Sequence, residues 1–200
     1  MLQTKGLMAK KHKKDSMEDI HKKRWFKITA LAVAFCFLLS GLTYYYYNAT
    51  SGIYEINVTR DSDFIHKIFE KDLYWLTTQS SHDTDYMLRH KASSKDPQHT
   101  GNLTIKVAYE GSTPVGFIAY YKKNFYIGYI LFIDVIDTFR AKGWGKRLLE
   151  YGVNDLVKKG CKRIELVTRT SNTAAQKLYS SYGFKETSRD EGFVHFEYTV

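Results

Sequence analysis

Alternating apolar and polar positions recur through the C-terminal half of the chain, and this two-residue period is typical of β-strands that bury one face. The expected strands are Leu103 to Tyr109, Pro114 to Tyr121, Phe125 to Val135, Lys162 to Thr168 and Phe193 to Val200. The residues Glu110 to Thr113 are suited to a turn that joins the first two strands as a hairpin. An earlier alternating run, Tyr54 to Val58, predicts one further strand.

Three segments instead space their apolar residues three and four positions apart, as an amphipathic helix does. They are Asp61 to Leu73, Lys146 to Val157 and Ser171 to Tyr182. Asp61 or Ser62 is the expected N-cap of the first helix, and Gly183 is suited to end the third. A short helix around Tyr86 to His90 is expected within an otherwise polar stretch. Together these elements predict an α/β (α+β) domain.

The residues from Ile28 to Tyr47 form a continuous apolar run, and no charged residue occurs between Lys27 and Glu55. Twenty helical residues span ~30 Å, which is the thickness of the hydrocarbon core of a bilayer. Aromatic residues at both ends of the run, Trp25 and Tyr44 to Tyr47, are typical of membrane interfaces. We therefore expect residues 28–47 to be a transmembrane helix. A core helix of a soluble protein and a cleaved signal peptide are the alternatives.

The segment before this run, residues 1–27, contains nine Lys/Arg and three Asp/Glu residues, so its net charge is +6. Its low apolar content predicts a disordered tail. Because positive charge beside a membrane span favours the cytoplasmic side, we expect a single-pass membrane protein with a cytoplasmic N-terminus. Bulky tyrosines stand where a cleavage site requires small residues, which favours an uncleaved anchor. Residues 51–200 then form the folded domain.

Charge and cysteine content argue against two classes of function. The formal net charge of the chain is +9, but only +3 of it lies beyond residue 27. Such a mildly basic domain is not typical of proteins that bind nucleic acid, so no nucleic-acid partner is expected. The two cysteines, Cys36 and Cys161, and the scattered histidines lack the spacing of a disulfide or a metal site. We therefore expect no metal cofactor.

The segment Arg140 to Gly145, with the sequence Arg-Ala-Lys-Gly-Trp-Gly, connects the longest predicted strand to a predicted helix. The first N–H groups of a helix have no intrahelical partner, and the helix dipole adds partial positive charge there. Gly143 and Gly145 let a ligand approach the backbone, while Lys142 and Lys146 add full positive charges. A turn of this kind indicates a phosphate site. Its spacing fits neither the dinucleotide fingerprint nor the P-loop.

The order Arg-x-x-Gly-x-Gly after a strand and into a helix resembles the acyl-CoA pyrophosphate loop of the GNAT superfamily of N-acetyltransferases. A second block, Asn-x-x-Ala-x-x-Leu-Tyr-x-x-Tyr-Gly-Phe from Asn172 to Phe184, resembles the second half of the GNAT core. The resemblance covers residues 103–200 and implies a mixed central sheet flanked by helices. It also implies acetyl-CoA as co-substrate and a primary amine, on a small molecule or a protein, as acceptor.

The resemblance further implies a set of residues that bind the donor. These are Ile133, Val135, Arg140, Lys142, Gly143, Trp144, Gly145, Lys146 and Asn172. In the family, the strand before the loop diverges from its neighbour, and the pantetheine arm pairs with the freed edge. A backbone N–H there, most simply that of Val135, polarises the thioester carbonyl. Trp144 stands where the family has a small or aliphatic residue, and it would narrow the pocket.

The sequence and the resemblance identify the general acid and the general base less completely than the donor site. Tyr179 matches the tyrosine that acts as general acid in the family, and its alternative role is that of a packing aromatic. Asn172 matches the asparagine that contacts the pantetheine arm in the family; its alternative role is that of a plain helix N-cap, and it can fill both roles at once. Asp134 is the candidate general base, while Tyr129, Glu165 and water remain open as alternatives.

The sequence therefore predicts a membrane-anchored N-acetyltransferase in which a primary amine attacks acetyl-CoA directly. The alternative is a non-catalytic acyl-CoA-binding module tethered to a membrane through residues 28–47. Acetyl-CoA is normally cytosolic, whereas the charge pattern places the domain on the opposite side of the membrane. The side that the domain faces is therefore left open, as are the identity of the acceptor and the oligomeric state.

Overall fold

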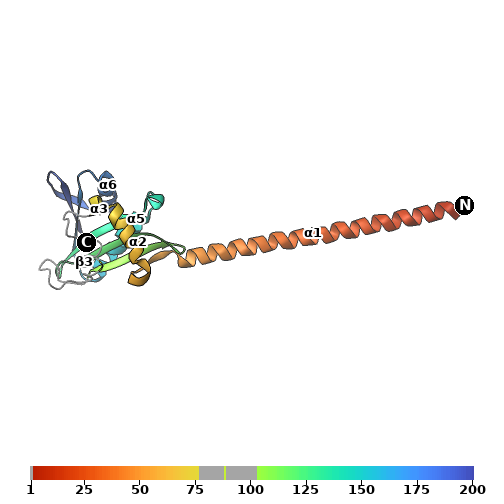
Figure 1. Cartoon of the computed structure of the whole chain (residues 1–200), viewed down its shortest axis with the longest axis horizontal. Helices are drawn as coiled ribbons and strands as arrows, with labels where there is room; N and C mark the ends of the chain where they lie inside the picture. Colours follow the sequence, from red (N-terminus) through yellow and green to blue (C-terminus); the bar gives the residue numbers. More distant parts are fainter. Residues whose placement is uncertain (1, 77–87, 89–102) are drawn as a thin grey trace. The chain divides into compact units, whose positions relative to one another are not determined.

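The structure, a computed structural model, describes residues 2–76, 88 and 103–200. The chain divides into two compact units, residues 1–49 and 50–200, which are described here one at a time (Figure 1). The short helix expected around Tyr86 to His90 lies outside the described residues, apart from Leu88.

The first unit consists of one helix, α1 (Leu2–Thr50), which contains both the basic segment and the apolar run. Residues 1–27 were expected to be disordered, but in this structure the segment is helical from Leu2. Two physical reasons account for the difference. The segment is rich in lysine and methionine, which have high helix propensity. It also continues an existing helix, so no new nucleus has to form.

Within α1, the stretch Arg24–Tyr46 is long and apolar enough to cross a membrane, judged by length and composition. It has 23 residues and a mean hydropathy of 1.9, and its apolar window is 0% buried against the described residues. A core helix packed inside this protein is therefore not what the structure shows. A signal sequence and a membrane anchor both satisfy the same criterion, so these two interpretations remain.

The described residues of the second unit form a mixed sheet of seven strands in the order β1-β2-β3-β4-β5-β7-β6. The strands are β1 (Gly52–Glu55), β2 (Thr104–Glu110), β3 (Thr113–Lys122), β4 (Ile127–Val135), β5 (Arg163–Arg169), β6 (Lys185–Arg189) and β7 (Phe193–Thr199). Neighbouring strands are antiparallel except β4 and β5, which are parallel. A parallel pair needs a crossover connection, and here a helix supplies it.

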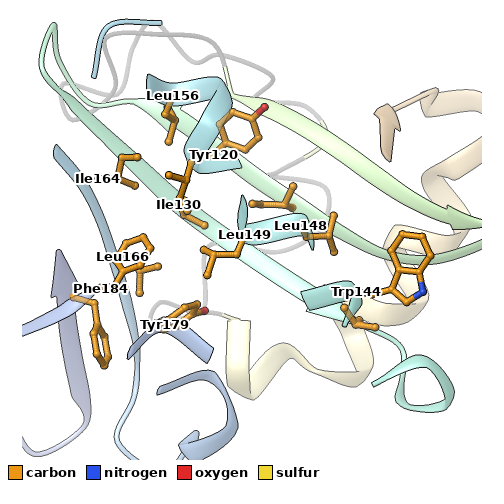
Figure 2. Packing of buried hydrophobic residues seen from close by; sticks show 14 of the residues in the cluster. Tyr120, Ile130, Trp144, Leu148, Leu149, Leu156, Ile164, Leu166, Tyr179 and Phe184 are labelled. Carbon is orange, nitrogen blue, oxygen red and sulfur yellow. The ribbon is translucent and has the colours of Figure 1, made fainter. Parts of the chain in front are cut away.

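Helices cover both faces of this sheet. They are α2 (Val58–Lys71), α3 (Leu73–Leu76), α5 (Trp144–Lys158) and α6 (Thr173–Tyr182), and a short 3-10 turn, η1 (Asp137–Phe139), precedes α5. One core, called here the α5-side cluster, packs Leu148, Leu149 and Leu156 against Tyr120 and Ile130 (Figure 2). The opposite core, the α2-side cluster, contains Ile65, Ile68, Phe69, Phe117 and Phe132. The expected sheet flanked by helices is confirmed.

Most of the expected elements form, with shifted ends. The helix expected from Asp61 begins earlier, at Val58, because the side chain of Asn57 accepts a hydrogen bond from the N–H of Arg60 (3.1 Å). Neither expected N-cap is therefore the cap, and Asp61 instead accepts from the N–H of Asn57 (2.9 Å). The first strand begins at Gly52 rather than Tyr54.

One strand was not expected at all. All five residues of β6 are exposed, so the strand has no buried face that could reveal it in the sequence. It forms because β7 offers a free edge with which it pairs in antiparallel register. Backbone pairing to a neighbour, rather than its own pattern of side chains, determines this element.

The close approach of β3 and β4 yields the first prediction. A Cβ on Gly116 would lie 2.5 Å from the backbone oxygen of Asp134 and 3.1 Å from Val135 Cγ2. Because a backbone atom cannot rotate away, Gly116→Ala is expected to destabilise the domain by about 1 to 3 kcal/mol. Near-UV circular dichroism during thermal unfolding of the full chain measures the effect. Gly192→Ala is the control, since its Cβ meets nothing within 4 Å. Equal melting temperatures for the two variants would contradict the prediction.

Candidate functional site

The parallel strands β4 and β5 pair over only part of their lengths. Their register runs from Ile127↔Arg163 to Tyr129↔Glu165 and then stops. Beyond that point β4 continues to Val135 and β5 to Arg169, with no pairing between them. The sheet therefore opens between these strands, and the expected divergence of the strand before the loop is confirmed.

Hydrogen bonding to β3 shows which backbone groups of β4 face the opening. The N–H of Ile136 donates to the carbonyl of Val115 (3.0 Å). In an antiparallel ladder, bonded and non-bonded positions alternate along the strand. The backbone groups of Asp134 therefore also face β3, whereas those of Ile133 and Val135 face the edge from which β5 has diverged.

A β-bulge determines the side on which the side chains of β4 lie. Ala119 pairs with Phe132 but Tyr120 pairs with Ile130, so Leu131 is an extra residue in β4. A bulge re-aims the side chains that follow it. Ile133 and Val135 consequently lie in the α5-side cluster, and Asp134 lies on the other face, near α3. The side of Asp134 was open in the sequence because a bulge inverts the strand parity.

The loop after β4 ends in a helix N-terminus whose donors are free. Gly143 is the N-cap of α5 and has φ +86°, a left-handed conformation that favours glycine. The first intrahelical bond runs from the N–H of Arg147 to the carbonyl of Gly143 (3.1 Å). In the part of the chain that the structure describes, the N–H groups of residues 143–146 donate no hydrogen bond. They form a cluster of donors suited to an anionic ligand.

Two lysines add charge around these donors. Lys142 is exposed, with Nζ 4.4 Å from the ring centroid of Phe139, and Lys146 is also exposed. Helix α6 lies beside the start of α5, because a Cβ on Gly145 would lie 3.4 Å from Leu178. Because both lysine side chains are exposed, they can turn towards a phosphate bound at the start of α5.

Trp144 does not narrow a pocket, contrary to the expectation. Its side chain is 4% exposed and belongs to the α5-side cluster (Figure 2). The indole Nε1 donates to Glu110 Oε2 (2.9 Å), and the guanidinium of Arg147 lies 4.0 Å from the ring centroid. The side chain therefore anchors the first turn of α5 to the end of β2, and only its backbone N–H is available to a ligand.

Arg140, which is expected to bind phosphate, contacts protein groups in this structure. Its Nε donates to the carbonyl of Val135 (2.7 Å), and its Nη2 contacts Asp72 Oδ2 (2.6 Å) and Asp134 Oδ1 (3.2 Å). Its Nη1 lies 2.8 Å from Asp137 Oδ1. Each guanidinium nitrogen thus has a protein partner, although the side chain is 45% exposed, and Arg140 ties the end of β4 to the corner between α2 and α3.

Val135 is affected by the same contacts. Its N–H, which was expected to polarise the thioester carbonyl, donates to Asp134 Oδ1 (2.7 Å). Its carbonyl accepts from Arg140. Among the residues expected to bind the donor through the β4 backbone, Ile133 is therefore the one whose groups face the opening without these local partners.

Asp134 is a buried carboxyl group in an unusual electrostatic setting. Its side chain is 10% exposed, and its Oδ2 has no hydrogen-bond partner within the described chain. Burial and then the negative charge of Asp72 raise the pKa of Asp134 to about 7, although Arg140 and the N–H of Val135 oppose the rise. A carboxyl group with this pKa exchanges its proton near neutral pH, as a general base must.

Tyr179 lies in α6, and its ring packs against those of Phe184 and Phe196. Figure 2 shows Tyr179 and Phe184 within the α5-side cluster. Its hydroxyl makes no hydrogen bond to the described residues. Burial raises the pKa of Tyr179, and the charge of Asp134 raises it further. The phenol therefore keeps its proton at neutral pH, as a general acid must.

Three further candidates can now be placed. Asn172 is the N-cap of α6, where its Oδ1 accepts from the N–H of Ala175 (3.1 Å), while its side-chain amide donates no bond within the described part of the chain. Both roles considered for it therefore remain compatible. Glu165 is held by Lys123 and Arg163, each at 3.0 Å. Burial raises the pKa of Tyr129 to about 12, which makes it a poor base at neutral pH.

Asp72 is a residue of this cluster that the sequence did not single out. It is the C-cap of α2, and it is buried beside Arg140. A negative charge at the C-terminus of a helix is unfavourable, because the helix dipole places partial negative charge there. An aspartate at the end of a helix therefore indicates that a cation compensates it. The sequence does not show that this cation is Arg140, which follows 68 residues later.

Comparison with known proteins gives a family match and several relatives. The family described as "Acetyltransferase (GNAT) family" matches residues 63–184. The [ribosomal protein bS18]-alanine N-acetyltransferase of Haemophilus ducreyi is 46% identical over 54 residues, 27% of this chain and 37% of that protein. N-alpha-acetyltransferase 30 of Xenopus laevis is 35% identical over 69 residues, 34% of this chain and 25% of that protein. The similarity thus spans only a minor part of the length of either relative.

Solved structures share the fold of the second unit. Ard1 from Thermoplasma volcanium aligns with a TM-score of 0.62 at 20% identity, covering 76% of this chain and 98% of that chain. A structure of yncA from Salmonella typhimurium with its cofactor acetyl-CoA aligns with a TM-score of 0.60 at 16% identity, covering 75% and 94%. Since the family match covers more than half of the sequence and the fold agrees with it, the chain belongs to the acetyltransferase (GNAT) family.

Proposed function

We propose that this protein transfers an acetyl group from acetyl-CoA to the α-amino group of a protein or peptide N-terminus. The observation that carries the proposal is the opening between β4 and β5, together with the N–H donors at the start of α5. Tyr179 lies in the α5-side cluster with Val135 of β4 and Leu166 of β5. Family membership supports acetyl transfer. The names of the two relatives, which describe N-acetylation of an alanine and of α-amino groups, support the class of acceptor.

The donor half of the site would use mainly backbone groups. The N–H groups of Gly143, Trp144, Gly145 and Lys146 would bind the pyrophosphate, helped by the charge of Lys142 and Lys146. The open edge of β4 at Ile133 and the side-chain amide of Asn172 would align the extended arm. Acetyl-CoA supplies the acetyl group as a thioester when it is bound.

The chemical half would use Asp134 and Tyr179. Asp134 would accept the proton of the attacking amine, and Tyr179 would donate its proton to the departing sulfur. An α-amino group has a pKa of ~8 and a lysine side chain one of ~10.4. A base whose pKa is about 7 is therefore much better matched to an N-terminus than to a lysine. This match is a second argument for the class of acceptor.

We also propose that the domain, residues 51–200 with its core at 103–200, is anchored by residues 28–47, with residues 1–27 on the cytoplasmic side. The apolar helix and the adjacent basic residues support this arrangement. A non-catalytic acyl-CoA-binding module was the alternative, and its only support was the lack of a clear base. The raised pKa of Asp134 supports the catalytic proposal over that alternative.

The acceptor class can be tested with the full chain in lipid nanodiscs, acetyl-CoA and two peptides. The first has a free N-terminal alanine and no lysine, and the second has a blocked N-terminus and one internal lysine. Mass spectrometry is expected to show acetylation of the first peptide only. Acetylation of the lysine alone would contradict the α-amino assignment. The absence of any turnover, with acetyl-CoA still bound, would support the non-catalytic alternative.

Tyr179→Phe tests the general acid. The ring contacts with Phe184 and Phe196 are retained in phenylalanine, and the hydroxyl makes no hydrogen bond to a described residue, so the melting temperature is expected to be unchanged. The rate of acetylation is expected to fall by about 10²-fold or more, with affinity for acetyl-CoA unchanged. Tyr182→Phe, another aromatic substitution in α6, is the matched control and should leave turnover intact. Equal rates for both variants would rule out the role of Tyr179.

Gly143→Ala tests the donor site, with Gly160→Ala as its matched control. The two glycines have φ +86° and +91°, and a Cβ on either meets nothing within 4 Å. Both variants are therefore expected to lose about 1 kcal/mol of stability through the same backbone strain. Only Gly143→Ala should weaken acetyl-CoA binding, by about tenfold or more in calorimetric titration, because only Gly143 presents the free donors. Equal affinities would contradict the assignment of the loop.

Membrane attachment is tested by alkaline extraction of membranes that contain the full chain. The protein is expected to remain in the pellet. Replacing Leu31, Phe35 and Leu38 together by aspartate should release it, because each charge at the centre of a span costs several kcal/mol. Replacing Lys10, Lys11 and Lys13 by glutamine is the control and should not release it. Release of the unmodified chain would show that the helix is not an anchor.

A further inference from the structure

We propose that Asp72, at the corner between α2 and α3, is a positioning residue for catalysis, which shares the guanidinium of Arg140 with Asp134 and so keeps Asp134 able to accept the proton of the acceptor amine. This inference rests on the proposed acetyl transfer and deepens it. It assigns a role to a residue outside the strand, loop and helix that carry the two family-like sequence blocks.

The geometry of the cluster is that of two buried carboxylates on one cation. Nη2 of Arg140 lies 2.6 Å from Asp72 Oδ2 and 3.2 Å from Asp134 Oδ1. The bond from its Nε to the carbonyl of Val135 (2.7 Å) fixes the plane of the guanidinium. Asp72 is 6% exposed, and Asp134 is nine-tenths buried. Both acids are thus held in place by a side chain that is itself tied to the end of β4.

One oxygen of this cluster has no partner. Asp134 Oδ1 accepts from the N–H of Val135 (2.7 Å) and from Arg140, but Oδ2 is buried without any partner among the described residues. A buried carboxylate oxygen without a donor is costly, and a catalytic role is one of the reasons for which native proteins keep such a group. An amine that enters beside β4 would supply the missing donor.

The charges around Asp134 explain why Asp72 is needed. Arg140 alone would hold Asp134 ionised and make it a weak base. Asp72 offsets that cation, and with burial it raises the pKa of Asp134 to about 7. The third acid, Asp137, is exposed and also pairs with Lys71, so it does not share the buried charge.

The other titratable groups near Asp134 do not change this balance. Tyr179, from α6, is a neutral phenol whose pKa is raised by burial and by Asp134 itself. Tyr129, on β4, is also neutral at physiological pH. From the α2–α3 corner the facing charge is Asp72, and from the loop after η1 it is Arg140. The pKa of Asp134 is therefore governed by two charged neighbours, the negative Asp72 and the positive Arg140.

The reaction step follows from this arrangement. The nitrogen of the acceptor amine forms a bond to the acetyl carbon, and the bond between that carbon and sulfur breaks. Asp134 Oδ2 takes one proton from the amine nitrogen. The sulfur leaves with its electron pair and takes the proton of the Tyr179 hydroxyl. Proton exchange with water then restores both side chains, so no further reactant is required.

The test compares Asp72→Asn with unmodified protein, as full chains in nanodiscs, with the same N-terminal alanine peptide across pH. Asparagine keeps an oxygen for Arg140 but removes the charge, so the cluster retains its shape. In the unmodified protein, kcat/KM is expected to fall as the pH drops below about 7. In Asp72→Asn this acid limb should move down by about one pH unit or more, and kcat at high pH should fall because the base is weaker.

Asp137→Asn is the matched control, because it removes another acid from the same arginine without a change inside the buried pair. Its acid limb should stay in place. The titration of the peptide amine is common to all three proteins, so it cannot produce a difference between them. An acid limb that is identical in Asp72→Asn and unmodified protein would overturn the proposal.

Two further measurements keep the test decisive if Asp72→Asn does not fold. Carboxyl-carbon NMR of unmodified protein with ¹³C-labelled aspartate should show one signal with a midpoint near 7 that is missing in Asp134→Asn. Titration of every aspartate below pH 5.5 would overturn the proposal.

The second measurement is the stability of Asp134→Asn. Because the pKa of Asp134 is raised in the folded protein, its carboxyl group lowers the free energy of unfolding as the pH rises from about 4 to 7. Asp134→Asn should therefore be inactive yet melt at a higher temperature than unmodified protein at pH 8, and not at pH 4.

Different results would refute the proposed acetyl transfer and the proposed role of Asp72. If the unmodified protein binds acetyl-CoA but acetylates neither peptide, the proposed function is wrong. If it acetylates the N-terminal peptide and Asp72→Asn has an unchanged pH profile, only the role of Asp72 is wrong. Calorimetric titration of acetyl-CoA into each variant should give unchanged affinity, since Asp72 is not among the groups proposed to bind the donor.

Discussion

The limited pairing of β4 with β5 is the constraint on which the site depends. Three residue pairs join the two parallel strands, and then their backbones separate. An unpaired strand edge inside a sheet leaves N–H and C=O groups without partners, which is unfavourable unless something else satisfies them. Here Arg140 and Asp134 satisfy those of Val135, and the edge at Ile133 is left for a ligand. The opening is thus held by specific contacts at its end.

The same contacts link the opening to the rest of the domain. Arg140 connects the end of β4 to Asp72 at the end of α2, and α3 packs against both β4 and β5. On the other face, Trp144 fixes the first turn of α5 to Glu110 of β2. The donor loop and the candidate base are therefore positioned from opposite faces of one sheet. Each is fixed by a side chain that the sequence pattern had indicated for ligand contact.

Stability and the proposed chemistry conflict at Asp134. A carboxyl group that is buried next to a second carboxylate lowers the free energy of unfolding at neutral pH, because its ionised form is poorly solvated. Strain and unsatisfied polar groups of this kind gather at functional sites. The surrounding clusters of large apolar side chains, on both faces of the sheet, supply the stability that offsets this cost.

Local pattern was enough to predict the hairpin of β2 and β3, strand β4, helices α5 and α6, and the glycine at the start of α5. Period and capping chemistry act over a few residues, and they are readable along the chain. The partner of Arg140, the burial of Trp144, the exposed strand β6 and the face on which Asp134 lies were not readable. Each depends on contacts between segments far apart in sequence, and the last also depends on one extra residue, Leu131, that inverts the alternation of β4. Three-dimensional packing alone settled these, because a side chain's pKa and partners follow from what surrounds it in space.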